Sequence, residues 1–262
     1  MSYGTILFTL ERGIARLTFN RPDKLNSFNT QMHTEVREAL ARVAAEKARV
    51  LVLTGAGRGF CAGQDLGDRA VAPGGDTVDL GDSIDRWYKP LILALHHLPM
   101  PVIAAVNGVA AGAGANIALA CDMVVAGRSA SFVQSFAKLG LLPDSGGTWV
   151  LPRLVGGARA MGLALLGNKL PAEQAAAWGL IWQCVDDAEL QPTVNVLAEG
   201  FATGPTRGFA MTKAAIRGSG QHTLEQQLDI ERDGMRELGR SSDYREGVAA
   251  FIAKRPAVFT GQ

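Results

Sequence analysis

The chain repeats a pattern in which an amphipathic segment leads into a short, almost wholly apolar run. Residues 31–46 carry apolar side chains every three to four positions, as in a helix, and VLVLT at residues 50–54 follows. The same order recurs with expected helices near residues 83–97 and 113–121, and with strands at residues 102–106 and 123–125. Helices that alternate with buried strands predict an α/β fold.

The two ends of the chain depart from this pattern. Residues 5–10 and 14–20 read as two strands around a Gly13 turn, which is typical of a hairpin. Beyond about residue 190 we expect helices alone, near residues 206–217, 223–238 and 242–254. We therefore divide the chain into a core domain, residues 1–195, and a helical region, residues 196–262. So small a helical region should pack on the core or on another subunit.

Composition narrows the possible partners. The 262 residues are 47% hydrophobic, and 26 basic side chains face 25 acidic ones, which gives no support for a nucleic-acid or polyanionic partner. Three widely spaced cysteines argue against a disulfide framework, and the four histidines lack metal-ligand spacing. No apolar run has the length of a membrane span. We expect a cytoplasmic protein that binds no metal, nucleic acid or membrane.

One stretch between these elements lacks any periodicity. Residues 72–82, APGGDTVDLGD, are rich in Gly and Asp, as is typical of a surface loop. We interpret it as a possible lid over a site.

Two glycine-rich turns follow predicted strands, at residues 54–65 and 107–116. Neither has the G-x-G-x-x-G spacing of a dinucleotide site or the G-x-x-x-x-G-K-[ST] pattern of a phosphate loop. Small residues nevertheless leave the backbone accessible, so one N–H group from each turn could bind the same ligand oxygen. The alternative is that both are only tight connections between strand and helix.

Five blocks in the same order resemble the crotonase (enoyl-CoA hydratase/isomerase) superfamily. They are NRPDKLNSF (20–28), GFCAGQDL (59–66), NGVAAGAGANIALACDM (107–123), KLGLLPDSGGTWVLPRLVG (138–156) and AFIAKR (250–255). The resemblance implies a spiral of ββα units whose C-terminal helices serve oligomerisation. It also implies an oxyanion hole formed by the N–H groups of Gln64 and Ala113.

Departures from the family pattern narrow the expected reaction. Hydratases of the family carry two catalytic glutamates, at positions that hold Asn116 and Phe136 in this chain. Neither side chain can hold and split a water molecule, so simple hydration is not expected. Asp144 follows the proline of LLPDSGG, where isomerases of the family place an acid/base. Its alternative role is to cap the helix that follows, because Asp before Ser-Gly-Gly-Thr is a common capping pattern.

The resemblance also assigns a site for coenzyme A, which belongs to the substrate and makes a separate cofactor unnecessary. The residues implied are Lys24, Leu25, Ala62, Asp65, Leu66, Phe251 and Lys254, the last two commonly reaching in from a neighbouring subunit. We therefore expect a homo-oligomer, a trimer or a dimer of trimers. Trp149, which follows Asp144 closely, is a candidate for the acyl pocket.

Three stretches, at residues 57–69, 159–170 and 241–262, are most similar to one branch of the family. Members of that branch rearrange a ring epoxide on a phenylacetyl-type CoA ester and shift double bonds in dehydroadipyl-CoA. A Δ3,Δ2-enoyl-CoA isomerase acting on fatty acyl chains would use the same Asp144 and remains an alternative. So does a non-catalytic member of the fold, such as an RNA-binding protein, although the near-neutral charge argues against it.

Overall fold

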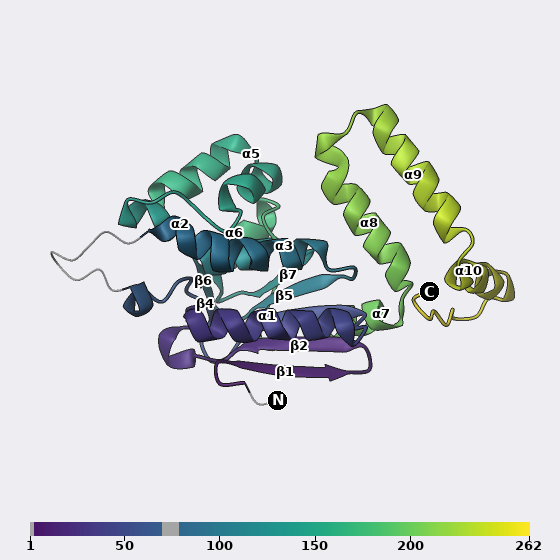
Figure 1. The fold of residues 1–262 in the computed structure, drawn as a ribbon, viewed down its shortest axis with the longest axis horizontal. Helices are drawn as coiled ribbons and strands as arrows, with labels where there is room; N and C mark the ends of the chain where they lie inside the picture. The colour runs from purple at the N-terminus through teal and green to yellow at the C-terminus, as the bar shows by residue number, and fades with distance from the viewer. Residues whose placement is uncertain (1–2, 70–78) are drawn as a thin grey trace.

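Two β-sheets and the helices around them make up the protein in this computed structural model, which describes residues 3–69 and 79–262 (Figure 1). The strands are β1 Ile6–Glu11, β2 Ile14–Phe19, β3 Val50–Gly55, β4 Gly59–Cys61, β5 Val102–Val106, β6 Val109–Ala111, β7 Met123–Gly127, β8 Ser131–Val133, β9 Lys169–Pro171 and β10 Gln183–Val185. The helices are α1 Thr30–Ala45, α2 Leu80–Ser83, α3 Lys89–His97, α4 Ala113–Leu119, α5 Gly147–Leu166, α6 Ala172–Ala177, α7 Leu190–Thr203, α8 Thr206–Gly218, α9 Leu224–Leu238 and α10 Ser242–Ala253. The predicted α/β organisation is confirmed.

The larger sheet has the strand order β1-β2-β3-β5-β7-β10. Strands β1 and β2 pair antiparallel and form the predicted hairpin, and the other neighbours pair parallel. The hairpin turn needs left-handed backbone at both Arg12 (φ 50°) and Gly13 (φ 78°), which fits a glycine. A second sheet, β4-β6-β8-β9, was not predicted, because strands of three residues are too short to show a period.

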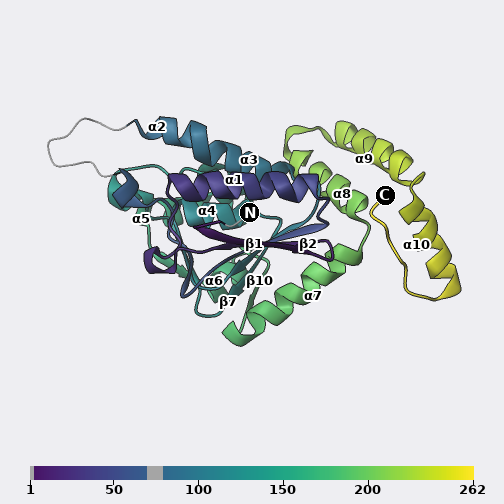
Figure 2. The same ribbon diagram turned by 60° about the horizontal axis from the view of Figure 1, so that its bottom comes forward.

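Buried side chains on the larger sheet alternate between its two faces. Leu51 and Leu53 of β3 point into the main core, to which helices α1 and α4 contribute, whereas Val50 and Val52 pack with residues of α7. Figure 2 shows α1 and α7 on opposite sides of the strands. Both faces of a parallel sheet are thus covered, which explains why its strands read as continuous apolar runs.

The segment between β4 and β5 includes the stretch interpreted as a lid. Residues 72–78 of that stretch lie outside the described residues. At Asp79 the side chain accepts hydrogen bonds from the N–H groups of Gly81 and Asp82 and caps α2. One π-helical turn, Ile84–Tyr88, then joins α2 to α3 and carries the chain along the main core.

Helix α5 is long and apolar enough to cross a membrane, judged by length and composition alone. It is not one continuous helix, because Gly156 has an extended backbone with φ 75° and ψ 163°. Pro152 lies inside the first half and removes a helical N–H donor. The two halves of α5 therefore form a bent segment, which contacts α4.

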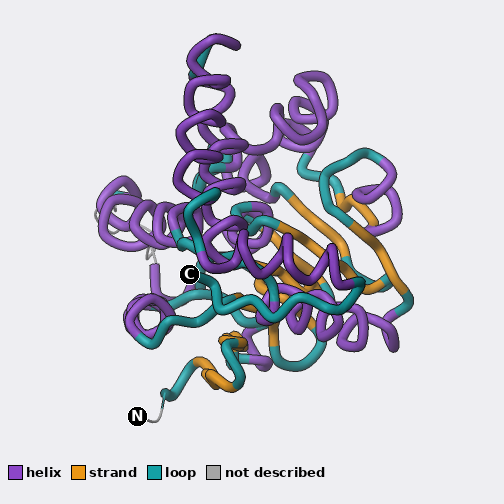
Figure 3. Tube along the Cα trace, turned by 90° about the vertical axis from the view of Figure 1, so that its right-hand side faces the viewer, coloured by secondary structure: helices purple, strands orange, loops and turns teal. Residues whose placement is uncertain are grey.

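The division expected at residue 195 falls inside α7, whose buried side chains pack on the larger sheet. The chain leaves this core after Gly204, and α8, α9 and α10 project from it (Figures 1 and 3). These helices expose apolar side chains along their length: Ile216, Leu224, Leu228, Met235, Phe251 and Ile252. As expected for so small a region, the segment has little core of its own.

Candidate active site

The first glycine turn fits closely against the start of α4. Gly63 has φ +90°, and a methyl group on its α-carbon would lie 2.9 Å from the Ala111 carbonyl oxygen and 3.2 Å from the Ala113 nitrogen. Only glycine is compatible with both this backbone angle and this spacing. The peptide that carries the Gln64 N–H therefore lies beside the Ala113 N–H.

A second glycine completes the fit from the other side. A methyl group on Gly114 would lie 2.2 Å from the carbonyl oxygen of Cys61, so α4 can begin against β4 only without a side chain there. Within residues 3–69 and 79–262, neither the Gln64 nor the Ala113 N–H donates a hydrogen bond to the protein. The structure thus brings the two predicted donors together with their N–H groups unused.

The side chain of Gln64 has a separate role in this arrangement. Its Oε1 atom accepts a hydrogen bond of 2.9 Å from the Tyr88 hydroxyl, and its backbone bridges to Phe28. Tyr88 is fully buried, so this contact connects the first glycine turn to the helix before β5. Sequence reasoning missed Tyr88, because nothing in its local pattern signals a contact 24 residues away.

Asp144 begins a tight turn before α5. The Gly147 N–H donates to the Asp144 carbonyl at 2.8 Å, while Ser145 (φ 50°) and Gly146 (φ 80°) both have left-handed backbone. These angles define a type I′ turn. Helix α5 begins at Gly147 with Gly146 as its N-cap, so the alternative in which Asp144 caps the helix is wrong. The half-buried Asp144 carboxylate instead accepts a hydrogen bond of 2.9 Å from the Ser145 hydroxyl.

Helix α4 connects this turn to the paired N–H groups. Asn116 lies one helical turn after Ala113, and its Nδ2 donates to the Asp144 carbonyl at 2.8 Å. Gln134 Nε2 donates in turn to Asn116 Oδ1, also at 2.8 Å. The base predicted at position 144 and the oxyanion donor predicted at position 113 are therefore joined through one short helix.

Asn116 and Phe136 occupy the positions where hydratases of the predicted family carry glutamates. Asn116 has no exposed surface, and both polar atoms of its side chain are hydrogen-bonded. The Phe136 ring is buried, and a methyl group on Gly112 would contact it at 3.7 Å. Neither position can supply a general acid or base.

Most of the residues expected to bind coenzyme A lie in two adjoining loops. Leu25 and Asn26 have left-handed backbone, and the Ala62 N–H donates to the Leu25 carbonyl at 2.9 Å. Lys24 and Leu66 are exposed on these loops. The structure thus gathers Lys24, Leu25, Ala62, Asp65 and Leu66 at one place, which is compatible with the prediction but does not test it.

Asp65 already has a partner within the protein. Its carboxylate forms an ion pair with Arg21 at 2.8 Å and accepts the Gly67 N–H at 3.0 Å. The Arg21 guanidinium holds the pKa of Asp65 below its ordinary value. Asp65 therefore fastens the loop, whatever it contributes to a ligand.

Phe251 and Lys254 lie far from the other five residues that are expected to bind coenzyme A. Both are on or directly after α10, at the opposite end of the protein from β4 and the loop that follows it (Figure 1). The Phe251 ring is 85% exposed. Within one protomer the structure does not bring these two residues to the other five.

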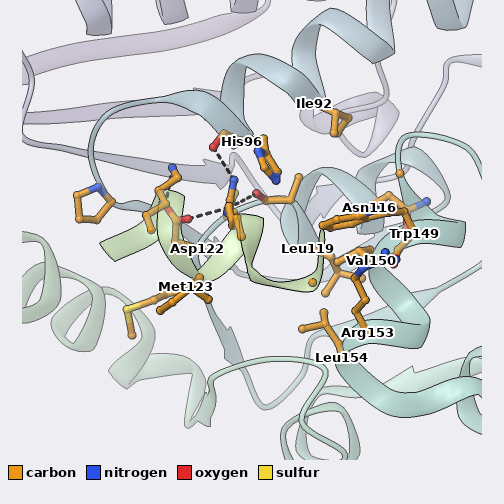
Figure 4. Close-up of a pocket in the computed structure, with 18 of the residues that line it drawn as sticks. Ile92, His96, Asn116, Leu119, Asp122, Met123, Trp149, Val150, Arg153 and Leu154 are labelled. Carbon is orange, nitrogen blue, oxygen red and sulfur yellow. Dashed lines mark hydrogen bonds and ion pairs between the residues drawn. The ribbon is translucent and has the colours of Figure 1, made fainter. Parts of the chain in front are cut away.

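An apolar cavity of about 740 Å³ opens beside the Asp144 turn. Figure 4 shows Trp149, Val150 and Leu154 of α5, with Ile92 and His96 of α3, among the residues around it. Helix α8 closes another side. Asn116, Ser145 and Gly146 also line it, whereas Gln64, Ala113 and Asp144 are not part of its wall among the described residues.

The cysteine thiols supply no nucleophile to this site. All three are free, and burial raises the pKa of Cys61 and of Cys121 to about 12, so both stay protonated near neutral pH. No cluster of His, Cys, Asp or Glu suited to a metal occurs in the described part of the chain. What the arrangement can do chemically is stabilise an oxyanion beside a carboxylate.

Comparison with known proteins gives the family of this chain. The sequence model of the family "Enoyl-CoA hydratase/isomerase" matches residues 9–262. The chain is 59% identical to 1,2-epoxyphenylacetyl-CoA isomerase of Escherichia coli (strain K12) over 98% of both chains. It is 48% identical to a Rhodobacter capsulatus protein named "Probable enoyl-CoA hydratase" over 100% of both. A crystal structure of enoyl-CoA hydratase from Bacillus anthracis superposes with a TM-score of 0.90, at 30% identity, over 99% of this chain and 100% of that one.

An α/β fold of this kind, with two sheets and helices around them, is that of the crotonase class of proteins. The chain belongs to the enoyl-CoA hydratase/isomerase family. The predicted family and fold class are confirmed.

Proposed function

We propose that this protein is a CoA-thioester isomerase in which Asp144 moves a proton beside an enolate held by the N–H groups of Gln64 and Ala113. The observation that carries this proposal is the link through α4. Ala113 stands at the start of that helix, and Asn116, one turn later, holds the carbonyl of Asp144. Helix α4 therefore links an oxyanion site to a carboxylate, and positions 116 and 136 supply no second acid or base.

The chemistry follows from these groups. Two N–H donors on the thioester oxygen favour removal of the α-proton, because they stabilise the negative charge that the oxygen acquires; one such donor is typically worth about 3–4 kcal/mol. Asp144 accepts the α-proton and returns it to another carbon of the conjugated system. The product has the same composition as the substrate, so the reaction is an isomerisation.

The side chains at positions 116 and 136 favour isomerisation over hydration. Relatives carry names of both hydratases and isomerases, so membership of the family alone does not choose between them. Adding water needs an acid and a base that hold the water between them, and a buried amide and a phenyl ring supply neither.

For the acyl group we propose a phenylacetyl-type ring epoxide, 1,2-epoxyphenylacetyl-CoA, with double-bond shifts of dehydroadipyl-CoA as a second activity. The 59% identity to the Escherichia coli isomerase supports this choice. The apolar cavity next to Ser145 and Gly146, with Trp149 in its wall, could hold a ring.

We further propose that the protein works as a homo-oligomer, a trimer or a dimer of trimers, held by residues 196–262. Leu224, Met235, Phe251 and Ile252 expose large apolar side chains on α9 and α10, which a second copy would cover. In such an assembly Phe251 and Lys254 could reach the coenzyme A loops of a neighbour, which they do not reach within one chain.

The test is the exchange of the α-protons of phenylacetyl-CoA into D2O, followed by NMR, in wild type and Asp144→Asn. We expect rapid exchange by wild type and a loss of about 10²–10⁴-fold in the variant, the usual contribution of a general base. Binding of the ester should persist, because the substitution is nearly isosteric. Asp186→Asn, which alters an exposed carboxylate paired with Arg128, is the matched control and should exchange as wild type does.

Exchange that survives in Asp144→Asn would refute the role of this carboxylate. If wild type exchanges the phenylacetyl ester poorly but converts a straight-chain 3-enoyl-CoA to the 2-enoyl ester, the fatty-acyl isomerase is the better assignment. No exchange and no ester binding in wild type would favour a non-catalytic member of the fold.

A further inference from the structure

We infer that Asn116, which is hydrogen-bonded to Gln134, is a positioning residue for the base Asp144. Its amide holds this single carboxylate in place at a position where hydratases of the family carry one of two catalytic glutamates. This inference rests on the proposed function of Asp144. It concerns the backbone of the Asp144 turn, which Asn116 contacts, and no direct contact with substrate is implied.

The hydrogen bonds run in one direction through two amides. Gln134 Nε2 donates to Asn116 Oδ1, and Asn116 Nδ2 donates to the Asp144 carbonyl, each at 2.8 Å. Because the oxygen of Asn116 is used by Gln134, only its nitrogen can face the turn. Both residues are buried, at 0% and 3% exposure, so loss of either side chain leaves the polar partner of a buried hydrogen bond unpaired.

The turn needs such support. Ser145 is not a glycine, yet its backbone has φ 50°, which L-residues adopt at a cost. The Asp144 carbonyl accepts two hydrogen bonds, from the Gly147 N–H within the turn and from Asn116 outside it. Asn116 also packs tightly there, since a methyl group on Gly147 would lie 2.5 Å from its Nδ2. The outer hydrogen bond thus fixes where the carboxylate stands relative to α4 and Ala113.

An amide is the side chain this geometry requires. An ionised carboxylate at position 116 would place a negative oxygen against the Asp144 carbonyl and repel it. A protonated carboxyl would instead keep an O–H donor for that carbonyl and an oxygen for Gln134. Asn116→Asp keeps the shape of the side chain, and its protonation state decides whether position 116 can donate to the Asp144 carbonyl. The variant therefore tests whether this hydrogen bond positions the base.

The experiment compares Asn116→Ala, Asn116→Asp and the surface control Asn168→Asp with wild type, using a 3-enoyl-CoA ester and the absorbance of the conjugated product. For Asn116→Ala we expect kcat to fall between about 10-fold and about 100-fold, with KM within about 3-fold of wild type, because a displaced base loses rate and not affinity. Asn168 is exposed after α5, and its variant should match wild type.

The pH dependence of kcat separates positioning from a role of Asn116 in stability alone, because a loss of stability would not make the kcat of Asn116→Asp depend on the protonation of position 116. Burial raises the pKa of a carboxyl introduced at position 116, so the ratio of kcat in Asn116→Asp to that in wild type should rise as the pH falls from 8 to 5. Asn116→Ala should show a flat ratio.

Asp122, Lys213 and Arg217 line the same cavity as Asn116 and are present alike in wild type and variant, so the ratio removes most of their effect. Asp144 is the base itself, His96 lines the same cavity, and the Cys61 thiol on β4 has a pKa of about 12. On α5, the Arg153 guanidinium lies over the Trp149 ring, 4.1 Å from its centroid.

The outcomes distinguish a failure of this inference from a failure of the proposed function. If Asp144→Asn is inactive but Asn116→Ala keeps the wild-type kcat, this inference fails and the proposed function stands. If Asp144→Asn stays active, the proposed function fails first. Should Asn116→Ala unfold, as judged by circular dichroism, the Asn116→Asp ratio decides alone: recovery at low pH supports positioning, and a flat ratio overturns it.

Discussion

The ammonium group of Lys213 lies 2.8 Å from the Asp122 carboxylate, and Arg217 contacts the other oxygen of the same carboxylate at 2.7 Å. Both cations come from α8, whereas Asp122 immediately precedes β7. The Val102 N–H of β5 also donates to this carboxylate at 2.8 Å. One half-buried anion thus fastens the C-terminal helices to the edge of the core.

Replacing Asp122 with Asn should loosen this attachment. Two cations would then lie without a counter-ion in a poorly solvated place, with Lys213 only 9% exposed. Removing one member of a buried ion pair commonly costs 3–5 kcal/mol, and for this incompletely buried cluster we expect about 2–3 kcal/mol in the free energy of unfolding. Urea denaturation followed by circular dichroism measures the loss.

Asp82→Asn is the matched control. Asp82 forms an ion pair with Arg86, but both side chains are more than half exposed, so its loss should change the free energy of unfolding by less than about 0.5 kcal/mol. Equal changes in the free energy of unfolding for the two substitutions would show that the cluster at Asp122 stabilises the protein no more than an exposed ion pair does.

Gly63→Ala should damage catalysis more than folding. Its methyl group would press on the Ala113 nitrogen from 3.2 Å at a backbone angle of φ +90°, which separates the two N–H donors. Loss of one oxyanion donor typically lowers kcat about 10²–10³-fold, and we expect an effect of that order. Steady-state kinetics with a 3-enoyl-CoA ester checks it.

Gly162→Ala provides the control for that substitution. Nothing lies within 4 Å of a methyl group at Gly162 on α5, and its backbone angle is ordinary. Wild-type kinetics in Gly63→Ala, with Gly162→Ala equally active, would mean that the donors do not depend on this close contact.

The ion pair between Arg21 and Asp65 predicts a pH dependence of stability. Because the Arg21 guanidinium holds the folded-state pKa of Asp65 below the ordinary 3.8, its stabilisation is fully present above pH 3.8 and is lost as the pH falls through the folded-state pKa. Asp65→Asn should therefore lower the free energy of unfolding by about 1 kcal/mol at pH 6, and the difference should shrink below pH 3.8.

Urea titrations of wild type and Asp65→Asn at several values between pH 6 and pH 3 make this comparison. A difference in the free energy of unfolding that stays constant across the range, or grows toward acid, would contradict a lowered pKa at Asp65. Asp85→Asn, whose pair with Lys89 is exposed, should show little difference at any pH in this range.

The order of the main elements could be read from the sequence because each central strand is buried on both faces. Strands β3 and β5 are runs of apolar residues, and α1 shows its buried stripe every three to four positions. The second sheet could not be read, since β4, β6, β8 and β9 each have three residues. The break in α5 at Gly156 was missed as well, because a glycine within an apolar segment does not by itself predict a break.

The sequence predicted the positions of the candidate donors and of the candidate base, but it did not predict the side-chain contacts that hold them. The glycine turns and Asp144 stand at positions that the family pattern marks. The contacts of Asn116 with Gln134 and Asp144 span 18 and 28 residues, and no local signal reports them. From the sequence, Asn116 was notable only because it replaces a glutamate of the family pattern. In the structure its amide forms two hydrogen bonds.

The facing glycines of the two turns have a consequence for how such a protein can diversify. The spacing of the N–H donors depends on the bare backbones of Gly63 and Gly114, and the cavity-wall side chains of Trp149 and Leu154 lie outside both close contacts. Residues such as Trp149 or Leu154 can therefore vary in size without disturbing the donors. Under the proposed function, different residues contact the reacting end of the substrate and its acyl tail, so a change of acyl group requires changes in the cavity wall alone.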